Sequence, residues 1–493
     1  MRNIYIFTII IIGAFLLSSC DDFLDKQPTN YTNAKKSIST VKDAEVMMNG
    51  IMRSLGDASL YGCNLLIYAD AKGGDYTVPS MGNGWDGLFT FNHSASAGSN
   101  SGFWSQGYFC IMLLNSFIEN VEELEAAGGT GYTFYRGQAY TLRALIYFEL
   151  TRLYGSPYNY KKEAYGVPEI LKTMPANAQP LRATVAENYK HIISDLQTGK
   201  EALSGDKKAK NAFISYWANR AIEARVKLFM DDYDGAFSAA KEIIDDGPYS
   251  LYANTNWASS WGKQFGTESI FEVAMYVGEA DQRTGSLAYI TARPYTLSTT
   301  QSISYYVASD YFLNRLGEDP TDIRWGVMDY DHTTSDNSRF GSSYKYAGGL
   351  ALSGDGKGSI SAVNIKVIRL SEIYLIAAEA ALNKSSKDAK LAADYLNEIR
   401  KRAPGLAAAT ETTISNDMIL DERSKELFGE GHRFFDLIRK NKTITFHDLF
   451  YNATRPTTRE NTIDRTFNKT ILPISQAEIN ANPPIGEQQN PGY

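Results

Sequence analysis

Two stretches of the chain carry aromatic and polar side chains in the combination that binds a sugar ring. In the first, Asp75 and Tyr76 precede Asn83, Trp85 and Asp86 within twelve residues. An aromatic face can pack on the C–H groups of a sugar, while carboxylates and amides hydrogen-bond its hydroxyls. We therefore predict that these five residues contact a ligand, with packing of the loop against the core as the alternative.

A second group of the same kind lies in the other half of the chain and comprises Tyr289, Arg293, Tyr295 and Tyr305. Both groups fall in long segments without helical periodicity, residues 56–103 and 278–362. Disordered segments are poor in aromatic residues, so we expect both segments to be folded and to carry binding surface. Four other tryptophans are assigned to structural packing: Trp104, Trp257, Trp261 and Trp325.

Three glutamates spaced four apart suggest catalysis, because paired carboxylates hydrolyse glycosides: Glu422, Glu426 and Glu430, followed by His432. On one helix, however, such residues form a row on a single side of any substrate, whereas glycosidase carboxylates must flank the bond. We interpret them as structural and expect ion pairs within the helix, Glu422 with Arg423 and Lys425, and Glu430 with Arg433. The chain is predicted not to be an enzyme, with a helical surface glycosidase or lyase as one alternative.

No cofactor or metal site is indicated by the sequence. The five histidines show no close spacing typical of zinc ligands, and no Gly-rich phosphate-binding motif occurs. Whether Cys63 and Cys110 form a disulfide stays open. With 49 Lys plus Arg against 56 Asp plus Glu, the net charge of −7 excludes a basic surface for nucleic acid. An acidic run lacks the spacing of a calcium loop and is interpreted as solvated: Asp319, Asp322, Asp329 and Asp331.

The N-terminus has the pattern of an export signal. A positive charge precedes an apolar run from Ile4 to Leu17, shorter than the roughly 20 residues of a membrane-spanning helix. The run ends in Leu-Ser-Ser-Cys20, which resembles a bacterial lipobox. We therefore expect residues 1–19 to be removed, Cys20 to receive the lipid anchor and residues 20–40 to form a tether. A plain secretory signal is the alternative.

The remaining sequence is predicted to be mainly helical. Residues 132–154 and 184–203 have helical apolar periodicity, and Thr184 and Glu187 have the spacing of a capping box. Several helices form pairs joined by short turns with small residues, similar to tetratricopeptide hairpins. We predict a mainly α, tetratricopeptide-like helical-repeat scaffold with long irregular loop insertions and few short strands, one at Ser269–Val273. Further helices are expected over residues 213–230, 233–246, 366–383, 387–402 and 415–440.

Many short stretches, in one order along nearly the whole chain, resemble the SusD/RagB family of nutrient-binding outer-membrane lipoproteins. In the first half they are Cys20–Asp25, Trp104–Asn115, Arg143–Phe148, Tyr154–Gly155, Val167–Pro168 and Ala224–Arg225. In the second half they are Asp319–Arg324, Arg369–Tyr374, Ala378–Ala380, Leu396–Arg400, Glu422–Arg423, Glu430–Gly431, Arg433, Asp436–Leu437, Leu472–Ile474, Glu478 and Asn490–Tyr493.

This resemblance implies a surface-exposed protein of the outer membrane that binds oligosaccharide, polysaccharide or peptide. It also implies a partner, a SusC-like TonB-dependent outer-membrane transporter, which receives the nutrient. Its ligand residues lie in variable loops, so the family pattern transfers none of them. We expect a SusD-like N-terminal helical region over residues 41–265, and a RagB/SusD-like region over residues 266–493 with the loops that bind ligand. A helical scaffold that binds only proteins is the other alternative.

Overall fold

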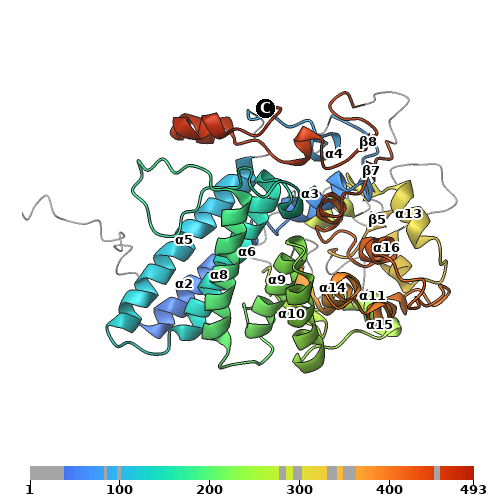
Figure 1. Cartoon of the computed structure of the whole chain (residues 1–493), viewed down its shortest axis with the longest axis horizontal. Helices are drawn as coiled ribbons and strands as arrows, with labels where there is room; N and C mark the ends of the chain where they lie inside the picture. The colour runs from blue at the N-terminus through green and yellow to red at the C-terminus, as the bar shows by residue number, and fades with distance from the viewer. Residues whose placement is uncertain are drawn as a thin grey trace, which may run out of the picture.

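Long antiparallel helices form one side of the molecule in the computed structural model, which describes residues 38–82, 86–96, 101–276, 285–292, 303–329, 341–347, 362–448 and 456–493. Helices α5 (Ser101–Ala126), α6 (Thr133–Tyr154) and α8 (Val185–Leu203) lie side by side, with α2 (Val41–Leu55) beside them (Figure 1). Glycine permits the close approach of α6 and α8. A Cβ atom built at Gly199 would lie 2.4 Å from Thr141 Oγ1.

A second set of helices stacks on the first. Helices α9 (Tyr216–Phe229) and α10 (Tyr233–Asp246) form one hairpin, and α14 (Leu370–Asn383) and α15 (Ala389–Arg400) form another. Buried alanines line these contacts, and small side chains let the helix axes approach closely. Ala224, Ala236 and Ala378 are fully buried. The predicted mainly α scaffold of paired helices is confirmed.

Local signals place several helix starts correctly. Thr184 Oγ1 accepts a hydrogen bond from Glu187 N at 3.2 Å, and Thr184 N donates to Glu187 Oε2 at 2.8 Å. This is the predicted capping box at the start of α8. Asp232 caps α10 by accepting from Gly235 N at 2.9 Å.

Two predicted helices are wrong in part. Residues 366–383 do not form one helix, because strand β6 (Ile365–Arg369) precedes α14 and pairs with β2 (Ser269–Val273). Residues 415–440 form α16 (Asn416–Glu426) and α17 (Arg433–Arg439) instead of a single helix. Gly429 and Gly431 between them have φ values of +78° and +83°, a conformation that glycine adopts without steric cost and that a helix cannot contain.

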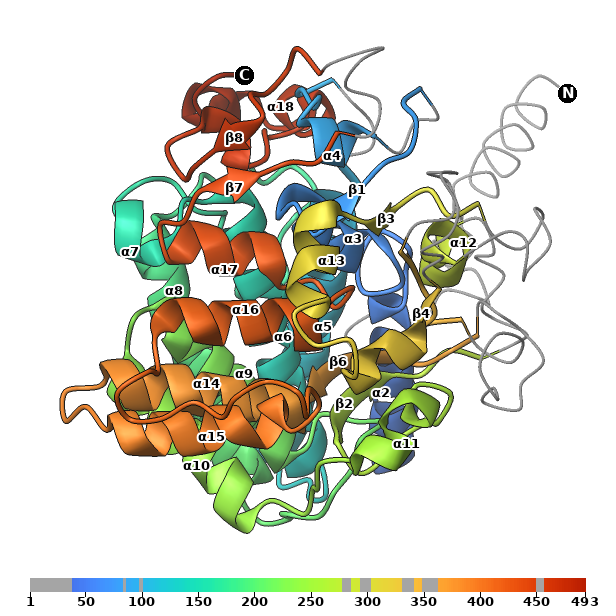
Figure 2. The same ribbon diagram turned by 90° about the vertical axis from the view of Figure 1, so that its right-hand side faces the viewer.

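Shorter elements fill the other side and the top of the molecule (Figure 2). Residues 56–103 are less irregular than predicted, since α3 (Asn64–Lys72) and α4 (Gly87–Thr90) lie within them. The other short helices are α7 (Tyr158–Lys161), α11 (Asn254–Ser260), α12 (Leu287–Thr291), α13 (Asp310–Leu316) and α18 (Gln476–Ala481), with 3-10 helices at Ile323–Val327, Asn468–Thr470 and Pro483–Gln488. The short strands are β1 (Tyr76–Thr77), β3 (Val307–Ala308), β4 (Met328–Asp329), β5 (Ser342–Ser343), β7 (Ile444–Thr445) and β8 (Thr462–Ile463).

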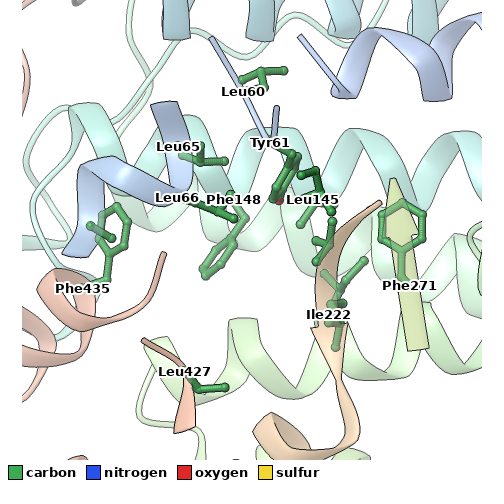
Figure 3. Close-up of a cluster of buried hydrophobic side chains, with 14 of the residues drawn as sticks. Leu60, Tyr61, Leu65, Leu66, Leu145, Phe148, Ile222, Phe271, Leu427 and Phe435 are labelled. Atoms are coloured by element: carbon green, nitrogen blue, oxygen red, sulfur yellow. The ribbon is translucent and has the colours of Figure 1, made fainter. Parts of the chain in front are cut away.

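One hydrophobic core joins the two halves of the chain. Leu66 from α3, Phe148 from α6, Ile222 from α9 and Phe271 from β2 belong to the same buried cluster (Figure 3). Phe435 of α17 also belongs to it, and its ring lies 5.8 Å from that of Tyr68. The tryptophans Trp104, Trp257 and Trp261 are buried, as predicted for packing residues.

Among the described residues, no helix is both long enough and apolar enough to cross a membrane. Cys63 and Cys110 are buried free thiols, which answers the question of their pairing. The sulfur of Cys110 lies 3.1 Å from Ser54 Oγ. Cys20 and the expected signal peptide lie outside the described residues.

Candidate functional site: the loop face

Strand pairing brings together the two segments that hold the predicted ligand residues. In β1 and β3, Tyr76 pairs with Ala308 and Thr77 with Val307, antiparallel. Strand β5 contacts β3, pairs with β4, and lies next to α12. Figure 2 shows β1, β3, β4 and α12 on the same side of the molecule. We call this region the loop face. Its strands β1, β3 and β5 are buried, so its accessible groups come from α12, the first turn of α13 and the start of α4, where Asp86 lies close enough to interact with Tyr306 beside β3.

The side chains of Asp75 and Tyr76 point into the protein rather than onto the loop face. Asp75 is 1% exposed, accepts a hydrogen bond from Ser424 Oγ at 2.6 Å and forms an ion pair with Arg315. Tyr76 is also 1% exposed, and its ring lies 4.7 Å from that of Phe428. The prediction that they contact ligand is therefore corrected: both have the packing role that was the alternative.

The other predicted ligand residues differ in their exposure. Tyr305 is buried and packs edge-on against Tyr306, with ring centroids 5.4 Å apart, so it is also a packing residue. Tyr289 is half-buried on α12, where its carbonyl oxygen accepts from Ile303 N at 2.7 Å. Asp86 is half-buried at the start of α4, and its side chain makes no capping hydrogen bond there. The other four predicted residues lie outside the described residues: Asn83, Trp85, Arg293 and Tyr295.

The structure adds three residues that sequence reasoning missed. Tyr311, on the first turn of α13, is 39% exposed and its ring lies 6.5 Å from the imidazole of His447. His447 Nε2 is 3.2 Å from Asp310 Oδ2. The hydroxyl of Thr77 in β1 donates to the His447 carbonyl, which fixes this group beside the β1–β3 pair. An exposed ring beside a carboxylate and an imidazole supplies the same sugar-binding chemistry. Ser309, which caps α13 through Phe312 N, is the signal that could have placed Tyr311 on a helix start.

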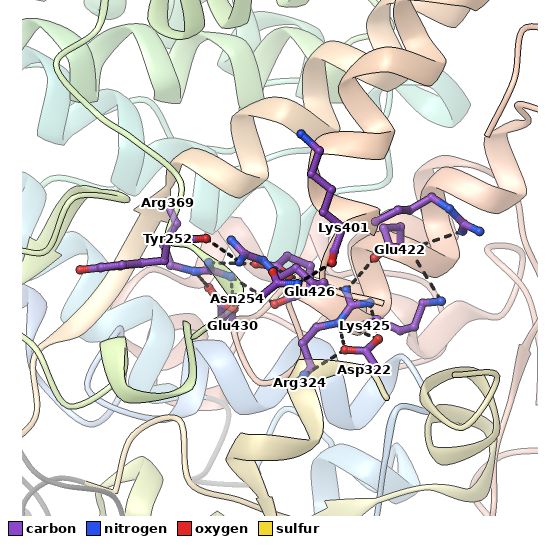
Figure 4. Close-up of polar contacts among 12 residues, drawn as sticks. Tyr252, Asn254, Asp322, Arg324, Arg369, Lys401, Glu422, Lys425, Glu426 and Glu430 are labelled. Carbon is purple, nitrogen blue, oxygen red and sulfur yellow. Dashed lines mark hydrogen bonds and ion pairs between the residues drawn. The ribbon is translucent and has the colours of Figure 1, made fainter. Parts of the chain in front are cut away.

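The row of glutamates that suggested catalysis is buried in an ionic cluster (Figure 4). Glu422 Oε1 accepts from Arg324 Nη1 at 2.7 Å, and Glu430 Oε2 from Arg369 Nε at 2.8 Å. Their structural role is therefore confirmed, but most of the predicted partners are wrong. Glu422 does lie 3.7 Å from Lys425, whereas the other two expected partners pair elsewhere: Arg423 with Asp436, and Arg433 with Asp75.

The electrostatics of this cluster are opposite to those of a general acid. Burial by itself would raise the pKa of Glu426, but Arg402, Arg369 and Arg324 outweigh it and lower this pKa to about 2. A glycosidase acid needs a raised pKa so that it holds a proton near neutrality. Glu426 is completely buried, so no substrate reaches it.

The acidic run was predicted to be a solvated loop. Where the structure describes it, this prediction is wrong. Asp319 is buried and accepts from Gly405 N at 2.6 Å, and Asp322 is buried beside Arg324, with Arg324 Nη2 at 2.6 Å. These hydrogen bonds explain the burial, since a buried carboxylate needs donors. Within the described part of the chain, no group of three or more His, Cys, Asp or Glu side chains is arranged to hold a metal ion.

Comparison with known proteins gives the family. Residues 246–493 match the SusD family, and residues 22–228 match a family described as starch-binding associating with outer membrane. A SusD-like protein of Formosa agariphila is 25% identical, with 90% of this chain and 92% of that protein covered. The starch-binding protein SusD of Bacteroides thetaiotaomicron is 28% identical over 130 residues, which are 26% of this chain and 22% of that protein.

Solved structures agree. A SusD superfamily protein from Bacteroides thetaiotaomicron superposes with a TM-score of 0.82 at 30% identity, covering 92% of this chain and 100% of that one. Another from Bacteroides vulgatus gives a TM-score of 0.80 at 29% identity, with coverage of 92% and 100%. The expected resemblance is confirmed, and the chain belongs to the SusD family.

Proposed function

We propose that the protein binds oligosaccharide or polysaccharide on its loop face at the cell surface and releases it chemically unchanged. The observation that carries this proposal is the β1–β3 pairing, which brings two separately predicted aromatic and polar segments to one side of the molecule. The accessible groups there are Asp86, Tyr289 and Tyr311 with its neighbours Asp310 and His447. The description of the matched family as starch-binding supports a carbohydrate ligand.

The proposed site also includes the residues predicted from the loop sequences: Asn83, Trp85, Arg293 and Tyr295. In the sequence, Trp85 directly precedes Asp86 and Arg293 directly follows Ala292 of the α12 C-terminus. Binding without catalysis is supported by the glutamate row, whose carboxylates are engaged by arginines in the core. In this proposal the protein therefore acts as a binding protein and not as a hydrolase.

The protein is proposed to be held on the outer membrane through lipid on Cys20, and to pass its ligand to a SusC-like TonB-dependent transporter. The Leu-Ser-Ser-Cys sequence supports the anchor, and the family description supports association with the outer membrane. Replacing Cys20 by Ser should release the protein from the membrane fraction. Retention of the Cys20→Ser protein in that fraction would argue against lipidation.

Binding to a glycan array by the soluble body, beginning at residue 21, tests the function. Tyr311→Ala should weaken binding of the captured glycan by about 1–2 kcal/mol, or roughly five- to thirtyfold in Kd, because stacking area is lost. Trp85→Ala should do the same without changing the melting temperature. Tyr165→Ala is the matched control, since Tyr165 is 46% exposed and comes four residues after α7, a helix that lies on the opposite side of Figure 2 from α12.

The alternatives give different results in the same experiment. Shortened glycan after incubation would indicate a glycosidase or lyase. A protein that captures no glycan but retains a protein partner would be a scaffold. A large drop in melting temperature for Trp85→Ala would assign that indole to packing.

A further inference from the structure

Two neighbouring hollows away from the loop face lie along the flank of α2. One has a volume of about 700 Å³, within the usual range of ligand sites, and its walls come from α2, α6 and the segments around residues 210 and 265. The second, of about 450 Å³, lies further along α2 towards its C-terminal end. Ala212 and Phe213 line both, so the two hollows are adjacent. We call them together the α2 groove. Figure 2 shows α2, β2 and α11 below the loop face.

Aromatic rings recur along the whole groove. Phe134, Tyr249 and Phe265 line the larger hollow, Phe213 stands between the two, and Tyr276 lines the smaller one. Tyr276 is 60% exposed and Phe265 is 37% exposed. Large aromatic side chains left in contact with water on a monomer commonly mark a binding surface. Their spacing along a helix flank suits an extended ligand that presents one ring face after another.

Polar groups of both signs accompany these rings, and the Lys210 ammonium lies 3.9 Å from the centre of the Phe134 ring. Glu45, Lys210 and Asn211 line the larger hollow, and Asn49 and Arg53 line the smaller one. A site for an anionic or a cationic ligand would carry side chains of one sign of charge. A site for a lipid or an apolar peptide would have aliphatic walls. A carboxylate acceptor together with amide and cationic donors, beside aromatic faces, suits a neutral ligand with many hydroxyl groups.

Phe265 is held in an unfavourable backbone conformation at the edge of the groove. Its φ of +51° lies in the left-handed region, which is costly for a bulky residue. Phe265 N donates to Glu272 Oε2 at 3.0 Å, and Asn211 Nδ2 donates to the Phe265 carbonyl at 3.3 Å. The surrounding structure thus maintains a strained turn that leaves this ring partly exposed, although burying the ring would be favourable.

An exposed glycine lines the smaller hollow. Gly50 lies within α2, where glycine is the least favourable residue apart from proline. No atom lies within 4 Å of a Cβ built at Gly50, so the core does not require glycine there. A large side chain at this position is therefore free to extend over the smaller hollow that Gly50 lines.

We propose that the α2 groove is a second saccharide-binding site, separate from the loop face, that takes a further stretch of the same polysaccharide. This inference rests on the proposed function as a glycan-binding protein. Two sites on one body make the binding of a long polymer bivalent, so the polymer binds more tightly than a short oligosaccharide that reaches only one site.

Two variants remove the groove while preserving the fold. Phe265→Gly deletes the ring and relieves the left-handed strain, so its melting temperature should equal or exceed that of the wild type. Gly50→Trp fills the smaller hollow and improves the helix propensity of α2. Lys190→Trp, at an exposed position of α8, is the control for adding an indole to a helix surface.

Affinity electrophoresis of the soluble body in gels containing starch, laminarin, xylan or mannan gives the test. Phe265→Gly and Gly50→Trp should each weaken retention by the bound polysaccharide at least fivefold, and Lys190→Trp should not. In a Trp85→Ala, Tyr311→Ala background, Phe265→Gly should abolish the binding that remains.

The outcomes separate this inference from the proposed function. If both groove variants are retained like the wild type in either background, the second site is refuted and the loop face keeps its role. If the groove variants alone abolish all retention, the groove is the principal saccharide site and the loop-face assignment falls. A wild-type protein that migrates freely in every gel refutes the saccharide assignment of both surfaces.

Discussion

Removing one guanidinium from the buried ionic cluster should cost several kcal/mol of stability. Arg369 is 4% exposed and lies between three carboxylates, with N···O distances of 3.0 Å to Glu268, 3.1 Å to Glu426 and 2.8 Å to Glu430. In Arg369→Met, Glu268 keeps Arg402 as its partner and Glu430 keeps Lys345. The three carboxylates then share one positive charge fewer, so the negative charge of Glu268, Glu426 and Glu430 together is no longer fully compensated.

Removing one partner of a buried ion pair typically lowers the free energy of unfolding by about 3–5 kcal/mol, and we take this as the size of the loss. For 493 residues, an unfolding entropy of ~2.1 cal/mol/K per residue sums to about 1 kcal/mol/K. We therefore expect the melting temperature of Arg369→Met to fall by about 3–5 °C in differential scanning calorimetry at pH 8. Lys390→Met is the matched control: its ion pair with Asp394, 2.8 Å long, is on the surface, and its loss should not change the melting temperature.

The pH dependence makes the interpretation specific. Burial raises the pKa of Glu430, and Arg369 and Lys345 reverse that effect in the wild type. Without Arg369, the folded-state pKa of Glu430 rises, so the folded form gains from protonation and the variant loses stability as the pH increases. The deficit relative to the wild type should therefore be smaller at pH 5 than at pH 8, and Glu430→Gln should restore part of it. A melting temperature within 1 °C of the wild type at pH 8, or a deficit that grows at pH 5, would refute this account of the cluster.

Two further predictions concern the scaffold. Burial and the nearby Arg225 and Arg423 lower the pKa of His432 to about 4, against the opposing carboxylate of Glu372. The neutral imidazole of His432 contributes to the free energy of unfolding above pH 6.5. About 3 kcal/mol of this contribution is lost as the pH falls from 6.5 to 4. His432→Gln should flatten this part of the stability curve in chemical denaturation, and an unchanged slope would contradict the assignment. Gly199→Val should cost about 1–3 kcal/mol by forcing α6 and α8 apart. Gly205→Val, at a position with no atom within 4 Å, should be neutral in the same melt, and equal losses would disprove the steric reason.

The helical body was predictable because its signals are local. Thr184 and Glu187 specify a helix start through atoms three residues apart, and the alanines around Ala224 and Ala236 indicate a close hairpin. The errors occur where tertiary contacts decide. The apolar run at Ile365–Arg369 has no feature that separates a buried strand from a helix, and its pairing with β2 makes it a strand.

The ligand residues were predictable only as segments. Composition indicates which loops carry rings and polar groups, but not which ring faces solvent. Tyr76 and Tyr305 became packing residues because Phe428 and Tyr306 lie beside them, and the sequence gives no measure of such distant contacts. Tyr311 was missed for the complementary reason, since its exposure depends on the position of α13 against α16. The partners of the glutamate row were wrong because Arg324 and Arg369 are far away in the sequence.

The position of the start of α2, where the N-terminal segment joins the folded part of the protein, bears on how the proposed receptor would work. The Tyr132 hydroxyl donates to the Ser39 carbonyl at 3.4 Å, and a Cβ built at Gly131 would lie 3.0 Å from Val41, so α2 starts against the α5–α6 turn. The 18 residues from Cys20 to residue 37 can span at most about 60 Å when fully extended. The proposed lipid on Cys20 would thus limit how far the start of α2 can lie from the membrane. This upper limit of length does not itself set the direction of the loop face, so delivery to the proposed transporter would need orienting contacts in addition.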